Sequence, residues 1–176
     1  MRFSLLPKLV TPRVTDITAD FLQQKGIRLL MLDFDNTIVP YTTSKPTREM
    51  EDWLKEMQTS SVAVCVVSNS HKDRVKIFCK QYGIDCITRA KKPFSKGIRE
   101  CLDKYGFDPS ECALAGDQIY TDVLGANCAG LYSIRVEAIS NHNVPLKLRH
   151  LLEIPFLFVA RKRVLDVQTE KKFPKH

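Results

Sequence analysis

Two carboxylates follow a nearly all-apolar segment early in the chain. Asp33 and Asp35 lie in the sequence DFDNT at residues 33–37, where the apolar segment at residues 27–34 ends. Burying an acid pair is costly unless a cation or a reacting phosphoryl group balances its charge. The same spacing also suits a helix cap or a turn, so the pair alone does not decide between a reactive site and a structural role.

Three further groups of polar residues each follow a segment that favours a β-strand. They are Ser68 with Asn69, Lys92, and Asp117 with Asp122. A hydroxyl and free main-chain N–H groups can hold phosphate oxygens, and a lysine can neutralise carboxylates or a phosphoryl group. Carboxylate oxygens suit Mg²⁺. Taken singly, each residue also fits a structural role, as a helix cap, a solvated lysine or a charge near a helix N-terminus.

Alternating strand and helix patterns predict an α/β fold, a parallel sheet with helices on both faces. Strands are expected at residues 27–34, 62–67, 112–115 and 132–136, with a weaker candidate at 85–88. Helices are expected at residues 47–59, 71–82, 94–105 and 122–129, and three of them end at a glycine. Ligands bind at the carboxyl ends of the strands in such sheets. All four polar groups fall at that edge. One shared functional site explains this better than four independent structural roles.

A single domain is expected over residues 1–176, with its core at about residues 27–136. The lead-in should hold a helix at residues 15–25, capped by Thr15 or Asp16. A helical extension is expected at about residues 140–165, including a helix at 144–152, before a frayed tail at 166–176.

Composition limits the class of protein. The chain of 176 residues is 44% hydrophobic and carries 27 Lys+Arg against 20 Asp+Glu. This excess of positive charge favours phosphates, anionic lipid or nucleic acid without choosing among them. The six cysteines show no zinc-ligand spacing, and no secretory signal or membrane-spanning run is visible. We therefore expect a cytoplasmic protein with reduced thiols, in solution or peripheral at a membrane surface.

The four polar groups, in this order, resemble the four motifs of the haloacid dehalogenase-like (HAD) phosphohydrolase superfamily. More narrowly, the chain resembles the subfamily IIIA, YqeG-type phosphatases related to phosphatidylglycerophosphate phosphatases. The resemblance spans about residues 7–161 and departs at Ser70, where this subfamily is expected to carry asparagine. It implies a Rossmann-like HAD fold. Because the intervals 37–62 and 69–92 are too short to hold a cap domain, we expect an open site.

The resemblance also implies a role for each candidate residue. Asp33 would attack phosphorus and form an aspartyl-phosphate, while Asp35 would protonate the leaving oxygen and then deprotonate water. Mg²⁺ would be held by Asp33, the main-chain carbonyl of Asp35 and Asp117. Ser68, Asn69 and Lys92 would bind the phosphate. Thr37 and Asp122 would support these groups without touching the substrate.

A lipid-linked phosphomonoester such as phosphatidylglycerophosphate is the substrate that the resemblance favours. Shallow contact with an anionic membrane could come from residues 1–6 and from the apolar segment 156–159 beside the basic run 161–163. That apolar segment also fits a terminal helix packed on the sheet. The alternatives are a soluble phosphometabolite or a phosphorylated macromolecule as substrate, or a non-catalytic module binding RNA or lipid. Since every motif acid and Lys92 are present, we expect an enzyme and no nucleic-acid partner.

Overall fold

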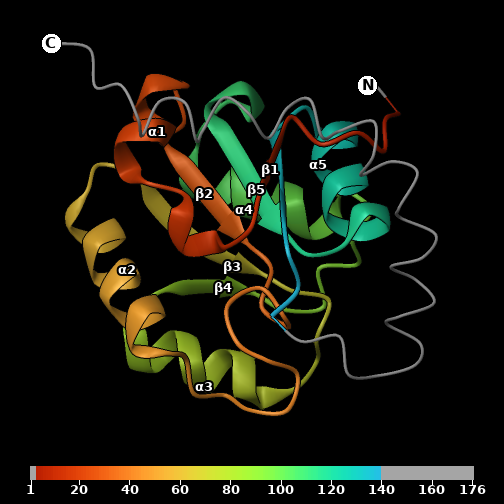
Figure 1. Ribbon diagram of the computed structural model, residues 1–176. Coiled ribbons are helices and arrows are strands. Elements are labelled where there is room, and N and C mark those ends of the chain that lie inside the picture. Colours follow the sequence, from red (N-terminus) through yellow and green to blue (C-terminus); the bar gives the residue numbers. More distant parts are fainter. Residues whose placement is uncertain (1–2, 140–176) are drawn as a thin grey trace, which may run out of the picture.

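The computed structural model describes residues 3–139, which form a six-stranded parallel sheet in the order β1-β6-β5-β2-β3-β4 (Figure 1). The strands are β1 (Leu9–Thr11), β2 (Leu29–Leu32), β3 (Ala63–Val67), β4 (Asp85–Ile87), β5 (Cys112–Gly116) and β6 (Tyr132–Val136). The helices are α1 (Ala19–Gln24), α2 (Arg48–Thr59), α3 (Asp73–Tyr82), α4 (Lys96–Tyr105) and α5 (Leu124–Ala129). The predicted α/β architecture is confirmed.

Strand β2 lies between β5 and β3 and is buried on both faces. Leu30 and Leu32 belong to the apolar core that also contains the buried side chains of α1, α2 and α3. Leu29 and Met31 belong to the second core, under α4 and α5. This alternation follows from the two-residue period of a strand, and it places helices on both faces of the sheet.

Local sequence signals explain the longer helices. Thr47 caps α2 by accepting a hydrogen bond from the N–H of Met50, and the buried residues of α2 recur at helical spacing. Its Trp53 donates from Nε1 to the Ile17 carbonyl at 2.8 Å. Helices α3, α4 and α5 each end at a glycine in the left-handed region, as the sequence predicts.

Several element boundaries differ from the sequence-based prediction. The edge strand β1 was not expected. The expected helix at residues 15–25 is divided into a 3₁₀ turn (Val14–Asp16) and α1, which Thr18 caps instead of Thr15 or Asp16, because Ile17 is extended between them. A π-helical turn (Ile119–Val123) precedes α5, so the expected helix at 122–129 becomes an α-helix only at Leu124.

The connections between the motif-bearing strands are short. Between β2 and β3 there is one loop and α2, and between β3 and β4 there is α3. Within residues 3–139, neither interval contains a cap domain, as predicted. No helix of this range has the length and apolar character that crossing a bilayer requires. The expected C-terminal extension and tail, the basic run at 161–163 and residues 1–2 lie outside the described residues.

Candidate active site

The polar groups singled out in the sequence meet at the carboxyl edge of the sheet. Asp33 directly follows β2, Ser68 follows β3, Lys92 follows β4 and Asp117 follows β5. All four side chains are buried, although each is polar or charged. Neighbouring parallel strands end at the same edge, so residues far apart in the sequence share one small volume.

Lys92 connects two of the buried acids. Its Nζ lies 2.7 Å from Asp33 Oδ1 and 2.7 Å from Asp122 Oδ1, and only 1% of the Lys92 side chain is exposed. Burial alone would lower the pKa of Lys92, but the two carboxylates outweigh it and hold the pKa above its ordinary value. The ammonium is therefore charged throughout the physiological range.

The carboxyl group of Asp33 is affected most by its burial. Loss of water raises its pKa from the ordinary 3.8 to about 6. Lys92 opposes this rise, and the nearby carboxylate of Asp122 adds to it. Near pH 7 Asp33 is mostly ionised, and a further cation beside it would stabilise that form.

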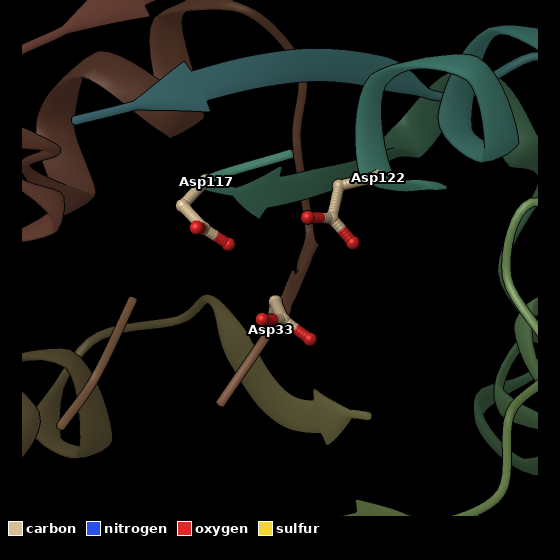
Figure 2. Close-up of side chains that lie close together, drawn as sticks. All are labelled: Asp33, Asp117 and Asp122. Carbon is tan, nitrogen blue, oxygen red and sulfur yellow. The ribbon is translucent and has the colours of Figure 1, made fainter. Parts of the chain in front are cut away.

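Three carboxylates converge on one space, as Figure 2 shows for Asp33, Asp117 and Asp122. One oxygen from each lies within 4.8 Å of the others, and all three residues are buried. When ionised, three carboxylates and one ammonium leave two negative charges without balance, which a divalent cation matches. The set of oxygen donors therefore fits a divalent metal ion.

The two oxygens of Asp122 already have partners. Oδ1 pairs with Lys92, and Oδ2 accepts a hydrogen bond from the N–H of Gln118 at 3.1 Å. Asp122 is thus suited to holding Lys92.

Gly116 lies against Asp122 so closely that no side chain fits there. A Cβ at this position would lie 2.3 Å from Asp122 Oδ2. We expect Gly116→Ala to displace Asp122 from Lys92, with a loss of about 1–3 kcal/mol of folding free energy and a clear loss of activity. Urea unfolding and phosphatase assays measure both. Gly125→Ala is the control: its Cβ would lie 3.3 Å from the flexible end of Ile98 and 3.4 Å from Pro93 Cα. Small shifts accommodate these contacts, so this variant should stay much closer to the wild type.

Asn69 fixes the loop that carries Lys92. Its side-chain Nδ2 donates to the Lys92 carbonyl at 2.9 Å, and its Oδ1 accepts from the Lys92 N–H at 2.7 Å. The sequence resemblance implies phosphate binding by the Asn69 main chain and gives no role to this side-chain amide. Ser70, at the position that departs from the subfamily pattern, accepts from Lys72 N–H at 3.2 Å through its hydroxyl.

The Asp35 carboxylate is paired with a residue that the sequence motifs do not reveal. The guanidinium of Arg74, in the first turn of α3, forms an ion pair with Asp35 Oδ1. No motif marks Arg74, and its position one residue into a helix gives no signal by itself. Thr37 lies in the tight turn after Asp35, and its buried hydroxyl has no hydrogen-bond partner among the described residues.

Three non-glycine residues of the site loops adopt a left-handed backbone conformation. Asn36, Arg89 and Lys91 have φ values of 61°, 55° and 58°. Asn36 follows Asp35, and Lys91 precedes Lys92. Residues in this region are disfavoured by about 1 kcal/mol or more and persist where the surroundings dictate the conformation, which is common at functional sites.

Comparison with known proteins gives consistent matches. The family model described as mitochondrial PGP phosphatase matches residues 2–139. The probable phosphatase YqeG of Bacillus subtilis is 31% identical over 136 residues, which cover 77% of this chain and 79% of that protein. Phosphatidylglycerophosphatase GEP4, mitochondrial, of Saccharomyces cerevisiae is 31% identical over 147 residues, covering 73% and 75%.

A plant relative is longer. Phosphatidylglycerophosphate phosphatase 1, chloroplastic/mitochondrial, of Arabidopsis thaliana is 27% identical over 170 residues, and the match covers 89% of this chain but 48% of that protein. This chain therefore spans about half the length of the plant enzyme.

Solved structures share the fold at low sequence identity. The cobalt-bound deoxy-D-mannose-octulosonate 8-phosphate phosphatase of Haemophilus influenzae has a TM-score of 0.53 at 14% identity, covering 81% of this chain and 94% of that one. The magnesium-bound putative HAD-hydrolase YfnB of Bacillus subtilis has a TM-score of 0.51 at 13% identity, covering 72% and 98%. On the family match and the relatives' identity, the chain belongs to the mitochondrial PGP phosphatase family and is a phosphoric monoester hydrolase, and it shares its fold with these solved phosphatase and HAD-hydrolase structures.

Proposed function

We propose that the chain hydrolyses a phosphomonoester in two steps through a covalent phosphoryl group on Asp33. In the first step a carboxylate oxygen of Asp33 bonds to phosphorus while the bond from phosphorus to the leaving oxygen breaks. In the second step water attacks the same phosphorus, and the bond to Asp33 breaks. The observation that carries this proposal is the buried Asp33 carboxylate, whose Oδ1 lies 2.7 Å from Lys92 Nζ at the end of β2.

The neighbouring residues supply the proton and the charge. Asp35 gives a proton to the leaving oxygen and later accepts one from the attacking water. Lys92 balances charge on Asp33 and on the transferred group, and Asp122 keeps Lys92 in position. Ser68, buried at the end of β3, and the main chain at Asn69 are suited to phosphate oxygens.

The divalent ion in this proposal is Mg²⁺. Asp33, Asp117 and the main-chain carbonyl of Asp35 would hold it, and it would supply charge neutralisation that lets an anionic nucleophile approach an anionic phosphate. The buried acid cluster of Asp33, Asp117 and Asp122 supports such an ion.

Removing Mg²⁺ should destabilise the protein more at pH 7.5 than at pH 5. The pKa of Asp33 is raised to about 6 in the folded state, so between about pH 4 and pH 6 the folded protein binds more protons than the unfolded chain. The contribution of Asp33 to stability therefore falls as pH rises through this window. Above it, the buried negative charge needs a cation. We expect millimolar Mg²⁺ to raise the thermal midpoint clearly at pH 7.5 and little at pH 5.

Differential scanning fluorimetry with EDTA or Mg²⁺ measures this effect, and Asp33→Asn serves as the comparison. The variant should show a smaller difference between the two pH values. An equal Mg²⁺ effect at both pH values in the wild type would contradict the role given to the charge of Asp33.

Phosphatidylglycerophosphate is the substrate that we propose. The match to the PGP phosphatase family and the names of the yeast and plant relatives support a lipid-linked phosphate. The short connections around the site also support a bulky substrate, since no cap encloses the site within residues 3–139. The phosphate group of a lipid at the membrane surface can enter such an open site while the acyl chains of the lipid stay in the bilayer.

Phosphate release from a substrate panel tests this proposal. The panel holds phosphatidylglycerophosphate vesicles, soluble phosphomonoesters and phosphopeptides, each with and without Mg²⁺. We expect Mg²⁺-dependent release that is fastest from the vesicles. A preference for a soluble ester or a phosphopeptide would replace the lipid assignment, whereas the lack of release from every member would refute the catalytic proposal.

A further inference from the structure

We infer that Arg74 is a positioning residue that holds Asp35 in the orientation needed for proton transfer. This inference rests on the proposed function, in which Asp35 serves the leaving oxygen and the attacking water. It concerns a residue outside the four motifs, on α3. The ion pair engages Oδ1 of Asp35, so the proton of the proposed transfer would be carried on Oδ2.

The guanidinium of Arg74 on α3 binds both the Asp35 carboxylate and the loop that contains Tyr41 and Thr43. Its NH2 group donates to Asp35 Oδ1, and its NH1 group donates to the carbonyls of Tyr41 at 2.9 Å and Thr43 at 3.1 Å. Tyr41 and Thr43 belong to the loop that follows the tight turn after Asp35. Arg74 therefore fixes both the carboxylate and the loop from one point on a helix.

Aromatic rings keep the guanidinium in place. Its Cζ lies 5.1 Å from the centroid of the Phe34 ring and 5.9 Å from that of Tyr41. Only 16% of the Arg74 side chain and 12% of the Asp35 side chain are exposed. Arginine combines cation–π contact with a rigid fork of N–H donors, and lysine reproduces this combination poorly. The contacts at this position therefore favour arginine over lysine.

The tight turn limits where the Asp35 main chain can lie, but it does not fix the carboxylate. Within the turn, Asn36 N–H donates to the Val39 carbonyl at 2.7 Å, and Ile38 N–H donates to the Phe34 carbonyl at 3.0 Å. These bonds hold the main chain on both sides of Asp35. The carboxylate is held by Arg74, and without it χ1 and χ2 of Asp35 are free to turn the proton away from the leaving oxygen.

The inference predicts an effect that depends on the leaving group. When the bond from phosphorus to oxygen breaks, a phenolate leaving group needs the Asp35 proton more than the stable p-nitrophenolate does. We expect Arg74→Met to lower kcat/KM about 100-fold for phenyl phosphate and less than about 10-fold for p-nitrophenyl phosphate. kcat/KM reports steps only through transfer to Asp33, so slow hydrolysis of the phosphoryl-enzyme does not mask the difference.

Four variants accompany Arg74→Met, among them Asp35→Asn alone and in combination with Arg74→Met. Arg74→Lys should recover only part of the lost activity toward phenyl phosphate, because lysine restores the charge without the fork of N–H donors. Lys76→Met, an exposed cation on the same helix, should match the wild type with both substrates. In the Asp35→Asn background, Arg74→Met should add no further dependence on the leaving group. Circular dichroism checks that each variant is folded.

The outcomes separate this inference from the proposed function. If Asp35→Asn is selective against phenyl phosphate and Arg74→Met is not, the positioning role is wrong while the proton-donor role of Asp35 stands. If Asp35→Asn slows both substrates equally, the proton-donor role fails and the positioning role falls with it. Equal losses for both substrates in Arg74→Met would indicate a purely structural contribution through the loop.

Discussion

Asp33→Asn is expected to abolish turnover while the protein stays folded. The amide is a poor nucleophile toward phosphorus, and loss of an attacking group lowers kcat by about 10⁴-fold or more in enzymes with covalent intermediates. The substitution nearly preserves the shape of the side chain and removes a buried negative charge. Because Lys92 keeps Asp122 as its charged partner at 2.7 Å, we expect the thermal midpoint to remain close to that of the wild type.

Steady-state kinetics and a trapping experiment measure this prediction. Acid quenching of the wild type during turnover of a ³²P-labelled phosphomonoester should leave label on the peptide containing Asp33, and the variant should carry none. The control Asp103→Asn, an exposed acid on α4, should retain full activity and labelling. Near-normal turnover in Asp33→Asn would assign the covalent step to another residue.

Lys92→Met is expected to cause the largest loss of stability. The substitution leaves Asp33 and Asp122 buried without the ammonium that lies 2.7 Å from each. Removing one partner of a buried ion pair costs about 3–5 kcal/mol, because the remaining charge has lost both water and its partner. Protonation of the acids offsets part of this cost, so the loss should be smaller at pH 5 than at pH 7.5. Activity should also be lost, since in the proposed mechanism Lys92 balances the charge of the transferred phosphoryl group.

Urea unfolding at the two pH values measures the effect of Lys92→Met. The matched control is Lys104→Met, which breaks the pair between Lys104 and Asp85 at 2.7 Å. Both side chains of that pair are nearly half exposed, so we expect a change of less than about 1 kcal/mol. Adding Asp122→Asn to Lys92→Met should recover part of the stability. Similar losses in the two lysine variants would show that the buried ion pairs of Lys92 contribute no more to the free energy of unfolding than an exposed pair does.

The sequence predicted the centre of the fold well because two signals agree there. The inner strands are continuous apolar segments, and the helices between them end at glycines that adopt the left-handed conformation. Because these strands are parallel, the carboxyl end of each marks the same edge of the sheet. The positions of Asp33, Ser68, Lys92 and Asp117 at that edge follow from this rule alone.

The features that sequence reasoning missed depend on tertiary contact. The edge strand β1 is three residues long, and it exists because Leu9, Val10 and Thr11 pair with β6, more than 120 residues away. Thr18 caps α1 because Ile17 packs into the core and interrupts the expected helix. Arg74 is one of many basic residues in the sequence, and only the fold reveals that it faces Asp35.

The site residues are far apart in the sequence, so the ribosome synthesises them at different times. Asp33 precedes its ammonium partner by 59 residues, and the second acid suited to the metal, Asp117, comes later still. At translation rates of about 5–20 residues per second, Asp33 leaves the ribosome seconds before Lys92 and Asp117 do. Under the proposed mechanism, Asp33 therefore cannot attack a phosphate ester until β5 has joined the sheet and completed the site. Catalytic competence thus arrives late in synthesis, together with the completed tertiary structure.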